Sequence, residues 1–589
     1  MYGNFEICDM PLSLKSNRAR VERFLADSGL RLEDVDYYAA VTDDDGMIIA
    51  GGGLQGNVIK CIAVGEAARE TGLSNKLISH LIGVAHQQGA ETVKVYTKPD
   101  NRTVFESMGF KIIASAPRAI LMENGMKGIN AYTDYLRRMR GDRPDGVAAI
   151  VMNANPFTQG HRYLVEQAAA ASSTLYVIAV REDRSTFSYA ERLAMIQTGC
   201  EGLDNVVVVE GSDYAISELT FPTYFLKQVT DATDTHITLD LDLFARHIAP
   251  ALGVTSRFVG SEPIDELTAR YNELMQEQLP QHGITVKTIE RMTLDGVPVS
   301  ASRLRQALAD GSLSQAAALV PPTTVPYLIA HLATDALRAE LNTTPKPGLV
   351  DRNDNGAHKD MDLALMNKSI DALLPYFVKL ALLGCKGSMP ETEEVRQIGL
   401  EAERAMLNAT GGVNTHRGAL FSMGLTTLAA AWCMKHNGSV EENQLQDLIM
   451  QVAEGFAPTT GTHGNDAVSA HRVTGALNLA KAGYPQLFNN WLPAYRSYLA
   501  ENAETASHKL LLLIMSQLDD TNVIHRVGFE VAQQVKQQAL ALLDNYSTAA
   551  MDAMNRDYIA RNISPGGCAD MVALTLFIQT ILNLHPYIN

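Results

Sequence analysis

Short apolar runs alternate with one amphipathic helical stretch in the first 135 residues. The runs YYAAVT, MIIAGGGL, VIKCIAV and TVKVYT have the length and the β-branched content of strands. The stretch SNKLISHLIGVAHQQG repeats apolar residues at helical spacing. The pattern therefore predicts a small α/β domain over residues 1–135.

The alternation resumes after a charged segment, LRRMRGDRPDG, which ends at Gly146 and is the first linker candidate. Six further apolar runs, each predicted to be a strand, are separated by helical segments: VAAIVMN, LYVIAVRE, NVVVVEG, HITLDLD, SRFVGSE and ITVKTIERM. Short buried strands that alternate with helices are typical of a doubly wound parallel sheet. We predict such a domain over residues 145–320.

The pattern changes beyond Pro321 and Pro322. The β-branched runs disappear, and long segments such as SIDALLPYFVKLALLGC and ALFSMGLTTLAAAWCM are apolar over most of a helical surface. Residues 325–589 are therefore predicted to be all-α. The expected fold class is multidomain, with two α/β domains followed by an all-helical one.

Composition and charge narrow the function classes. A chain of 589 residues with 46% apolar and 20% charged residues is a folded protein too long for a single core. Its formal net charge of −17 opposes nonspecific binding to nucleic acid or to an anionic membrane. The six cysteines lie far apart without a C-x-x-C pair, and no window reaches the roughly 18 apolar residues of a membrane span. We expect a cytoplasmic protein with neither nucleic acid nor membrane as a partner.

The segment GGGLQG (residues 51–56) matches the dinucleotide-binding pattern G-x-G-x-x-G. That pattern requires a helix behind the glycines, whose N-terminus points at a pyrophosphate. A strand-like run, NVIKCIAV, follows here instead. The segment is therefore predicted to be a hairpin turn.

A better phosphate candidate in this domain is RETGLS (residues 69–74), which opens the helical stretch and offers free backbone N–H groups. With Asn101 and the later FESMGF, it resembles the GCN5-related N-acetyltransferase fold, whose R-x-x-G-x-G/A turn holds the CoA pyrophosphate. The resemblance implies that a CoA-like group binds at Arg69, Gly72 and Ser74, although Ser74 replaces the usual Gly or Ala. No catalytic base is evident, and a fold kept for docking without acetyl transfer to an amine is the equal alternative.

The strongest signal joins VAAIVMN to a helical segment through NANPFTQGH (residues 153–161). A nucleotide binds at the carboxyl end of the first strand of a doubly wound sheet. Gly160 would allow close approach there, and His161 could donate a hydrogen bond to a phosphate at the helix start. A buried histidine that only caps the helix is the alternative.

A second basic element, PVSASRLR (residues 298–305), lies near the end of the same predicted domain. Nucleotidyl transfer needs charge neutralisation more than covalent chemistry, so two cationic elements around a triphosphate suit it. The segment could equally be an N-cap followed by a solvated helix face. Together the two elements resemble the T/H-x-G-H and I-S-S/A-T-x-x-R motifs of the nucleotidylyltransferase superfamily, which attacks the α-phosphate and expels pyrophosphate.

This resemblance implies catalytic roles for Thr158, His161 and Arg305, with Thr158 in the place of the first histidine. It also implies an ATP-binding set: Asn155, Phe157, Gly160, His161, Ser300, Ser302, Arg303 and Arg305.

Within that superfamily, residues 1 to about 320 resemble citrate lyase ligase. The matches are NPFTQGH, SDYAISELTFPTYFLK, and RFVGSEP with Tyr271 and Asn272 beyond it. The family converts acetate and ATP to acetyl-AMP, then acetylates the thiol of a CoA-like prosthetic group on the citrate lyase acyl carrier subunit. The resemblance implies that the turn at residues 69–74 holds the pyrophosphate of this group.

Four polar clusters interrupt the apolar helices of the last domain. They are TPKPGLVD with GAHKDMD, which follow Glu340; TGGVNTHRG; DDTNV with His525; and NISPGGCAD. Any one of them could be an ordinary loop between helices. Four in one domain are harder to dismiss, because buried acids are costly unless they are paired or metal-bound. Asp360 and Asp362, two positions apart, suit chelation of Mg²⁺ beside a phosphate.

The set resembles triphosphoribosyl-dephospho-CoA synthase over about residues 325–589. That family joins ATP to dephospho-CoA, displacing adenine and keeping the triphosphate. The resemblance implies that a ribose hydroxyl attacks C1′ of the ATP ribose, that Mg²⁺ on carboxylates holds the triphosphate, and that an acid protonates adenine. Two features depart from the family: Arg417 replaces a frequent Lys, and GALNL (residues 475–479) lacks the Arg and Glu of G-A-R-G-E-A.

The same resemblance implies residue roles in this domain. Asp360 and Asp520 would be catalytic, and the metal would bind at Asp360, Asp362, Asp519 and Asp520. ATP would bind at Lys346, Gly411, Gly412, His416, Gly566 and Gly567.

Both resemblances concern the building and charging of one prosthetic group, so the sequence predicts a bifunctional maturation enzyme for citrate lyase. Its predicted substrates are ATP, acetate, dephospho-CoA and the carrier subunit, and a separate transferase would attach the precursor. One alternative is a nicotinamide-mononucleotide-type adenylyltransferase. The other is a helical half that binds ATP in a regulatory role without turning it over.

Overall fold

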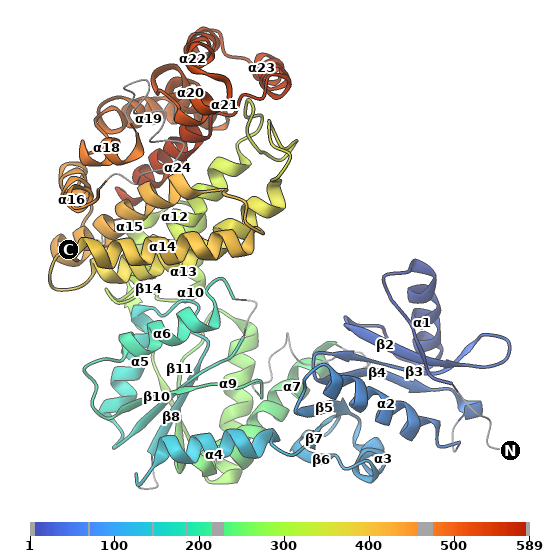
Figure 1. The fold of residues 1–589 in the computed structure, drawn as a ribbon. Helices are drawn as coiled ribbons and strands as arrows, with labels where there is room; N and C mark the ends of the chain where they lie inside the picture. Colours follow the sequence, from blue (N-terminus) through green and yellow to red (C-terminus); the bar gives the residue numbers. More distant parts are fainter. Residues whose placement is uncertain are drawn as a thin grey trace. The chain divides into compact units, whose positions relative to one another are not determined.

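The computed structural model describes residues 6–68, 71–143, 147–182, 185–214, 229–457 and 475–584. The chain forms two compact units, Met1–Val299 and Ser300–Asn589, which are described separately (Figure 1). The first unit holds two β-sheets with their helices, and the second is helical.

The first sheet of unit 1 has seven strands in the order β1-β2-β3-β4-β5-β7-β6. All neighbouring strands are antiparallel except β4 and β5, which pair in parallel over two residues. The strands are β1 (Cys8–Asp9), β2 (Tyr37–Thr42), β3 (Ile48–Gln55), β4 (Val58–Val64), β5 (Thr92–Thr97), β6 (Lys111–Ser115) and β7 (Ile120–Gly125). The helices are α1 (Lys15–Asp27), η1 (Glu66–Ala68), α2 (Leu73–Gln87), η2 (Pro99–Asn101), α3 (Arg102–Ser107) and α4 (Gly128–Arg140).

The hairpin turn predicted at GGGLQG is confirmed only at the end of the segment, because residues 51–55 belong to β3. Gln55 pairs with Val58, and Gly56, with φ +53°, lies in the two-residue turn. The first three glycines lie within β3, where a Cβ on Gly51 would meet Tyr38 Oη at 2.6 Å. They are therefore glycines because neighbouring side chains fill the space beside the strand.

The second sheet has five strands in the order β10-β9-β8-β11-β12, all parallel, which confirms the predicted doubly wound sheet. The strands are β8 (Val147–Met152), β9 (Leu175–Ala179), β10 (Val206–Glu210), β11 (Val254–Gly260) and β12 (Thr285–Ile289), with a small hairpin of β13 (Thr293–Leu294) and β14 (Val297–Pro298). The helices are α5 (Gln159–Ala170), α6 (Tyr189–Gly199), α7 (Val229–Leu243), η3 (Phe244–Ile248), α8 (Ala249–Leu252), α9 (Glu266–Gln278) and η4 (Leu279–His282).

The prediction of a strand at HITLDLD is wrong, because these residues lie in α7. Ile237 and Leu241 belong to the core of the parallel sheet, whereas Leu239 and Leu243 belong to the core of the seven-stranded sheet. Each pair is spaced four residues apart, so each forms one stripe of a helix. Two opposite stripes on a helix between two cores produce the alternation that resembled a strand.

The linker prediction for LRRMRGDRPDG is also partly wrong. Its first five residues, 136–140, form the end of α4, and Leu136 is fully buried in the core of the parallel sheet. Residues 141–143 follow the helix, and residues 144–146 lie outside the described part.

The described residues of unit 2 form helices joined by loops and contain no strand, which confirms the predicted all-α region. The helices are α10 (Ala301–Ala309), α11 (Leu313–Ala318), α12 (Val325–Asn342), α13 (Leu363–Gly384), α14 (Thr392–Ala409), α15 (Arg417–Asn437), α16 (Glu442–Glu454), α18 (Ala476–Lys481), η5 (Leu487–Trp491), α19 (Leu492–Glu501), α20 (Ala503–Gln517), α21 (Thr521–Val527), α22 (Phe529–Asp544), α23 (Thr548–Ala560) and α24 (Gly566–Ile581). Helix α13 packs against α12, α14 and α15, and α24 against α12, α15 and α20. Among the described helices, none has the length and hydropathy needed to cross a bilayer.

Candidate active sites

The turn between β8 and α5, residues 153–161, is here called the phosphate turn. Ala154 adopts φ +46°, a left-handed conformation that is costly for a residue with a Cβ. Thr158 is the N-cap of α5, and its Oγ1 accepts a hydrogen bond from the His161 backbone N–H at 3.3 Å. The Thr158 N–H in turn donates to Nδ1 of His161 at 3.0 Å. This reciprocal capping box fixes the imidazole at the start of the helix.

The capping box also decides which ring nitrogen of His161 carries the proton. Because Nδ1 accepts from a backbone N–H, the neutral ring must carry its hydrogen on Nε2. Burial, together with the positive charge of Arg291, lowers the pKa of His161 to about 4. The side chain is therefore a neutral donor at physiological pH. The alternative of a capping histidine and the prediction of a phosphate donor are thus compatible, since each uses a different nitrogen.

Two other predicted ATP-binding residues of this turn have structural partners. Phe157 is fully buried, and a Cβ on Gly199 would lie 2.4 Å from its ring. Asn155 Oδ1 accepts from the Phe187 N–H at 3.1 Å. Gly160 approaches the Val299 carbonyl so closely that a Cβ would lie 3.0 Å from it. These contacts explain the residue types by packing, and their roles toward ATP stay predictions.

Arg192, on α6, is a positioning residue that sequence reasoning missed. Its guanidinium is fully buried and donates to the carbonyls of Asn153 (2.8 Å) and Val180 (2.9 Å), and to Asn153 Oδ1 (2.7 Å). It also donates to the carbonyls of Phe187 and Glu182. The loops that follow β8 and β9 are thereby joined at the carboxyl edge of the sheet. No sequence pattern indicates this role, because all but one of these acceptors are backbone carbonyls.

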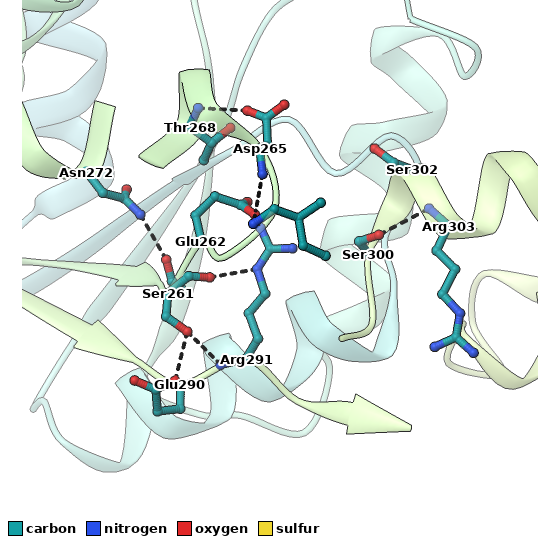
Figure 2. Close-up of polar contacts among 12 residues, drawn as sticks. Ser261, Glu262, Asp265, Thr268, Asn272, Glu290, Arg291, Ser300, Ser302 and Arg303 are labelled. Atoms are coloured by element: carbon teal, nitrogen blue, oxygen red, sulfur yellow. Dashed lines mark hydrogen bonds and ion pairs between the residues drawn. The ribbon is translucent and has the colours of Figure 1, made fainter. Parts of the chain in front are cut away.

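A second cross-link joins the loops after β11 and β12, and Figure 2 shows it. Arg291 Nε donates to the Ser261 carbonyl at 2.8 Å, and Arg291 forms an ion pair with Glu262. Ser261 Oγ donates to Glu290 at 3.0 Å, while Asn272 donates to the Gly260 carbonyl at 3.1 Å. Arg291 is thus the cation whose field reaches His161, and it too was missed from the sequence.

The basic element predicted to complete this site begins the second unit. Ser300 is the N-cap of α10, and its Oγ accepts from the Arg303 N–H at 3.1 Å (Figure 2). Arg305 donates to Ser302 Oγ at 3.2 Å, and burial lowers its pKa. The N-cap alternative therefore describes the local structure. Its convergence with the phosphate turn stays a prediction.

The predicted CoA-binding turn is described only in part, since Arg69 lies outside the described residues. Gly72, with φ +76°, is the N-cap of α2, and Ser74 lies in the first turn of that helix. The positive φ explains the glycine, and the helix start leaves backbone N–H groups without helical acceptors. The role of this turn stays a prediction.

In unit 2, loops far apart in sequence meet; we call their meeting place the loop cluster. His358 Nε2 lies 2.8 Å from Ser564 Oγ, and Gly348 N–H donates to Asn555 Oδ1 at 2.8 Å. Arg526 donates to His358 Nδ1 at 3.1 Å, so the ring hydrogen of His358 is on Nε2. Arg526 was not predicted. These contacts join the first polar cluster of the sequence to the NISPGGCAD cluster, and the hydrogen bond from the Cys568 N–H to Asp520 joins the DDTNV cluster to them.

The loop cluster contains a fully buried ion pair, in which Lys346 Nζ donates to Glu340 Oε1 at 2.6 Å. The Lys346 backbone N–H donates to Asp351 Oδ2 at 2.9 Å. The predicted ATP-binding lysine is thus already paired with a carboxylate.

Asp520 and Asp570 are two further acids of the loop cluster. Asp520 caps α21 by accepting from the Asn522 and Val523 N–H groups, and it also accepts from the Cys568 N–H at 2.8 Å. Burial raises its pKa, while these donors oppose the shift. Burial, with the charges of Asp520 and Glu340, raises the pKa of Asp570 well above its usual range.

Glycines make room for these two acids. A Cβ on Gly418 would lie 2.0 Å from Asp570 Oδ2, and one on Gly567 would lie 3.1 Å from Asp520 Oδ2. Gly566 is close to Asn522 in the same way, at 2.9 Å. Gly411 and Gly412, in contrast, have positive φ values, and no atom lies near the position of a Cβ. The NISPGG motif therefore has a packing reason at both glycines.

His416, from the TGGVNTHRG cluster, is buried and holds an unpartnered nitrogen. Thr415 Oγ1 donates to Ser369 Oγ at 2.6 Å, and Ser369 Oγ lies 2.8 Å from His416 Nδ1. The serine hydroxyl, already an acceptor, donates to Nδ1, which leaves the hydrogen on Nε2. Nε2 is buried without a partner. Burial and the charge of Lys346 lower the pKa of His416 to about 3.

The predicted metal ligands are not gathered. Asp360 is exposed near His358, Asp362 caps α13 by accepting from Leu365 N–H, and Asp519 pairs with Lys536. Among the described residues, no group of three or more His, Cys, Asp or Glu could hold a metal ion. Mg²⁺ often takes one or two carboxylates, with phosphates and water completing its shell. The metal assignments stay predictions.

Three family models match separate parts of the chain. An acetyltransferase (GNAT) domain matches residues 21–126. A citrate lyase ligase C-terminal domain matches residues 147–328, and an ATP:dephospho-CoA triphosphoribosyl transferase matches residues 326–587.

The curated relatives fall into two groups. A citrate (pro-3S)-lyase ligase of Escherichia coli is 38% identical over 57% of this chain and 98% of its own length, and one of Klebsiella pneumoniae is 42% identical over 54% and 93%. A 2-(5''-triphosphoribosyl)-3'-dephosphocoenzyme-A synthase of Pectobacterium atrosepticum is 38% identical over 42% of this chain and 85% of its own length.

The phosphate turn of unit 1 and the loop cluster of unit 2 therefore lie in two enzymes joined in one polypeptide. The chain is a bifunctional enzyme that belongs to the citrate lyase ligase family in its first half and to the triphosphoribosyl-dephospho-CoA synthase family in its second.

Proposed function

We propose that the chain matures citrate lyase by two ATP-dependent reactions in the cytoplasm. In the first, an acetate oxygen attacks the α-phosphorus of ATP, and the bond from that phosphorus to the β-phosphate bridging oxygen breaks. Pyrophosphate leaves with the electron pair, and acetyl-AMP remains. The observation that carries this assignment is the capping box, which keeps Nε2–H of His161 as a donor at the start of α5.

The second half-reaction transfers the acetyl group. The thiol sulfur of the prosthetic group on the citrate lyase acyl carrier subunit attacks the acetyl carbon, AMP leaves, and the thiol proton is lost to solvent. The start of α2 at Gly72 is a suitable place for the pyrophosphate of that group, because its N–H groups lack helical acceptors. The acetyltransferase-like domain then serves for docking.

The helical half makes the precursor of the same group. The 2′-hydroxyl of dephospho-CoA attacks C1′ of the ATP ribose, the bond from C1′ to adenine breaks, and the triphosphate is kept. Burial and neighbouring acids raise the pKa of Asp570, so its carboxyl group holds a proton more readily than an ordinary aspartate and is a suitable proton donor to adenine. His416 Nε2–H, buried without a partner, is a suitable donor to a phosphate oxygen.

Mg²⁺ would neutralise triphosphate charge in both reactions, with Asp360 and Asp362 as its proposed ligands in the helical half. Both carboxylates lie at the exposed start of α13, where a phosphate-bound ion could reach them. A separate transferase would attach the finished precursor to the carrier subunit. The adenylyltransferase alternative is not favoured by the two groups of relatives.

The experiment is chromatography of purine products after incubation of the chain with Mg-ATP. Free adenine is expected only with dephospho-CoA, and AMP only with acetate and the thiol form of the carrier subunit. AMP without adenine would overturn the second activity and favour a regulatory helical half. AMP transfer to nicotinamide mononucleotide, without acetate dependence, would overturn the first.

A further inference from the structure

A small hollow lies at the carboxyl edge of the parallel sheet, in unit 1. Its walls include Val151 on β8, Ile178 and Val180 at the end of β9, Ser212 beyond β10, and Phe244 on η3. We call it the edge hollow. The phosphate turn leaves β8 at this same edge, one residue after Met152.

Arg257, on β11, lines the edge hollow and is 3% exposed. Its Nη2 donates to Tyr271 Oη at 3.4 Å, but Nε and Nη1 are buried without a hydrogen-bond partner. Among the described residues, no carboxylate forms an ion pair with it. A buried guanidinium with two unused donor groups is costly unless a ligand completes it.

The charged groups around Arg257 are already engaged elsewhere. Tyr271 donates to Asp240 and accepts from Arg257, so the phenol lies between this carboxylate and the guanidinium. Lys94 lies 3.8 Å from the centre of the Tyr214 ring and pairs with Asp213. The aromatic ring of Phe244 lies 4.5 Å from the Arg257 guanidinium and covers one of its faces. The unpartnered donors are Nε and Nη1, which lie on different edges of the guanidinium, so each can donate a separate hydrogen bond to an anion in the hollow.

The remaining surface selects the class of anion. Val151, Ile178 and Val180 are aliphatic, so the bare oxygens of phosphate or sulfate would be left without donors against them. Asp240 also lines the hollow, and its charge repels a dianion about twice as strongly as a monoanion. A short-chain monocarboxylate has one anionic end for Arg257 and one apolar end for these walls.

We propose that the edge hollow is the acetate subsite and that Arg257 binds the acetate carboxylate. This inference rests on the proposed ligase reaction and adds the residue that selects its acid substrate. Arg257 binds and orients the carboxylate end of acetate, and the aliphatic walls contact its methyl group. The phosphate turn binds the nucleotide at the same edge of the sheet.

The first test compares Arg257→Lys and Arg257→Met with the unchanged chain in acetate-dependent pyrophosphate release. The KM for acetate should rise about tenfold or more, as expected for a lost charge-assisted hydrogen bond, with little change in the KM for ATP. Arg246→Met is the matched control, because Arg246 is half-exposed on η3 and pairs with Asp242. An unchanged acetate KM in both Arg257 variants would overturn the proposal.

The second test measures a gain of preference for a new substrate, which loss of the fold cannot produce. Val151→Ala removes two methyl groups from the aliphatic wall and so enlarges the hollow. The preference for propionate over acetate should therefore increase about tenfold. A misfolded chain cannot gain a substrate. An unaltered preference would place the methyl group of acetate elsewhere and contradict the subsite.

The third measurement separates this inference from the proposed reaction. Saturation transfer to the acetate methyl signal in NMR should be seen with the unchanged chain and with Arg246→Met, and be lost with Arg257→Met. If the unchanged chain gives no acetate-dependent pyrophosphate release yet shows this transfer, the reaction fails while the subsite stands. If transfer is absent, or equal in all three chains, the subsite fails.

Discussion

The phosphate turn and the loop cluster, the two proposed triphosphate sites, are built in opposite ways. The phosphate turn is local: one strand, one loop and one helix place His161, whose ring is fixed by Thr158 three residues away. The loop cluster is non-local: His358 meets Ser564, and Gly348 meets Asn555, across more than 200 residues. The local site depends on backbone geometry, and the non-local site on the packing of buried acids.

Both sites keep a neutral histidine with its hydrogen on Nε2, but for different reasons. At His161 the backbone N–H of Thr158 fixes the tautomer, and at His416 the hydroxyl of Ser369 does so. Only proline removes a backbone donor, whereas many substitutions remove the hydroxyl of a serine. The comparison therefore teaches that the second site is the more fragile one.

The largest expected effect is that of His161→Ala. Removal of the Nε2 donor should lower acetate-dependent pyrophosphate release roughly 10³-fold, while adenine release with dephospho-CoA stays unchanged. His282→Ala, at an exposed position, is the control. Loss of both activities together would contradict two independent sites.

Arg192→Met tests how far the local site depends on its supports. The carbonyls of Asn153 and Val180 would lose their buried donor, which should reduce the free energy of unfolding of unit 1 by about 3 kcal/mol. Hydrogen exchange in β8 and β9 measures this loss. Arg137→Met, at an exposed ion pair, should change the hydrogen exchange of these strands little. Equal protection in both variants would contradict the role of Arg192 in joining the two loops.

Gly418→Ala tests how far the non-local site depends on the close approach of a glycine to its acids. The added Cβ would collide with the Asp570 carboxylate, and the overpacking should cost about 2 kcal/mol in unit 2 and reduce adenine release. Gly399→Ala, in α14 with open space around it, should instead be neutral or slightly stabilising. Thermal unfolding with purine chromatography compares the two; similar behaviour would argue against the close approach.

The smallest expected effect is on the pH dependence of stability. The folded-state pKa of Asp570 is raised, so above the usual pKa of aspartate, about 4, the folded chain binds more protons than the unfolded chain. Stability from this group is complete below that pH and is lost as pH rises through the raised pKa. Asp570→Asn should flatten this slope, by at most about 1.4 kcal/mol per pH unit. Denaturant titrations from pH 4 to 8 check it, and an unchanged slope would contradict the shift.

The family motifs were readable because they are short. NPFTQGH predicted the start of α5 and a histidine at its first turn, since strand, glycine and cap are adjacent in sequence. The turn at Gly56 was predicted too, but the run of glycines at 51–53 that suggested it lies within β3. The residue roles inside those motifs were less readable, because Phe157 and Gly567 are explained by contacts with Gly199 and Asp520.

The sequence by itself determined the order of the three regions, the parallel sheet, the helical half and the position of the phosphate turn, because each depends on local periodicity and adjacent residues. Only the tertiary structure decided that HITLDLD is a helix, since its alternation comes from two cores packed on opposite sides of α7. It alone placed Arg192 on distant carbonyls and left Arg257 without a carboxylate. The energy of a buried charge depends on which atoms surround it, and those atoms come from segments that no local pattern connects.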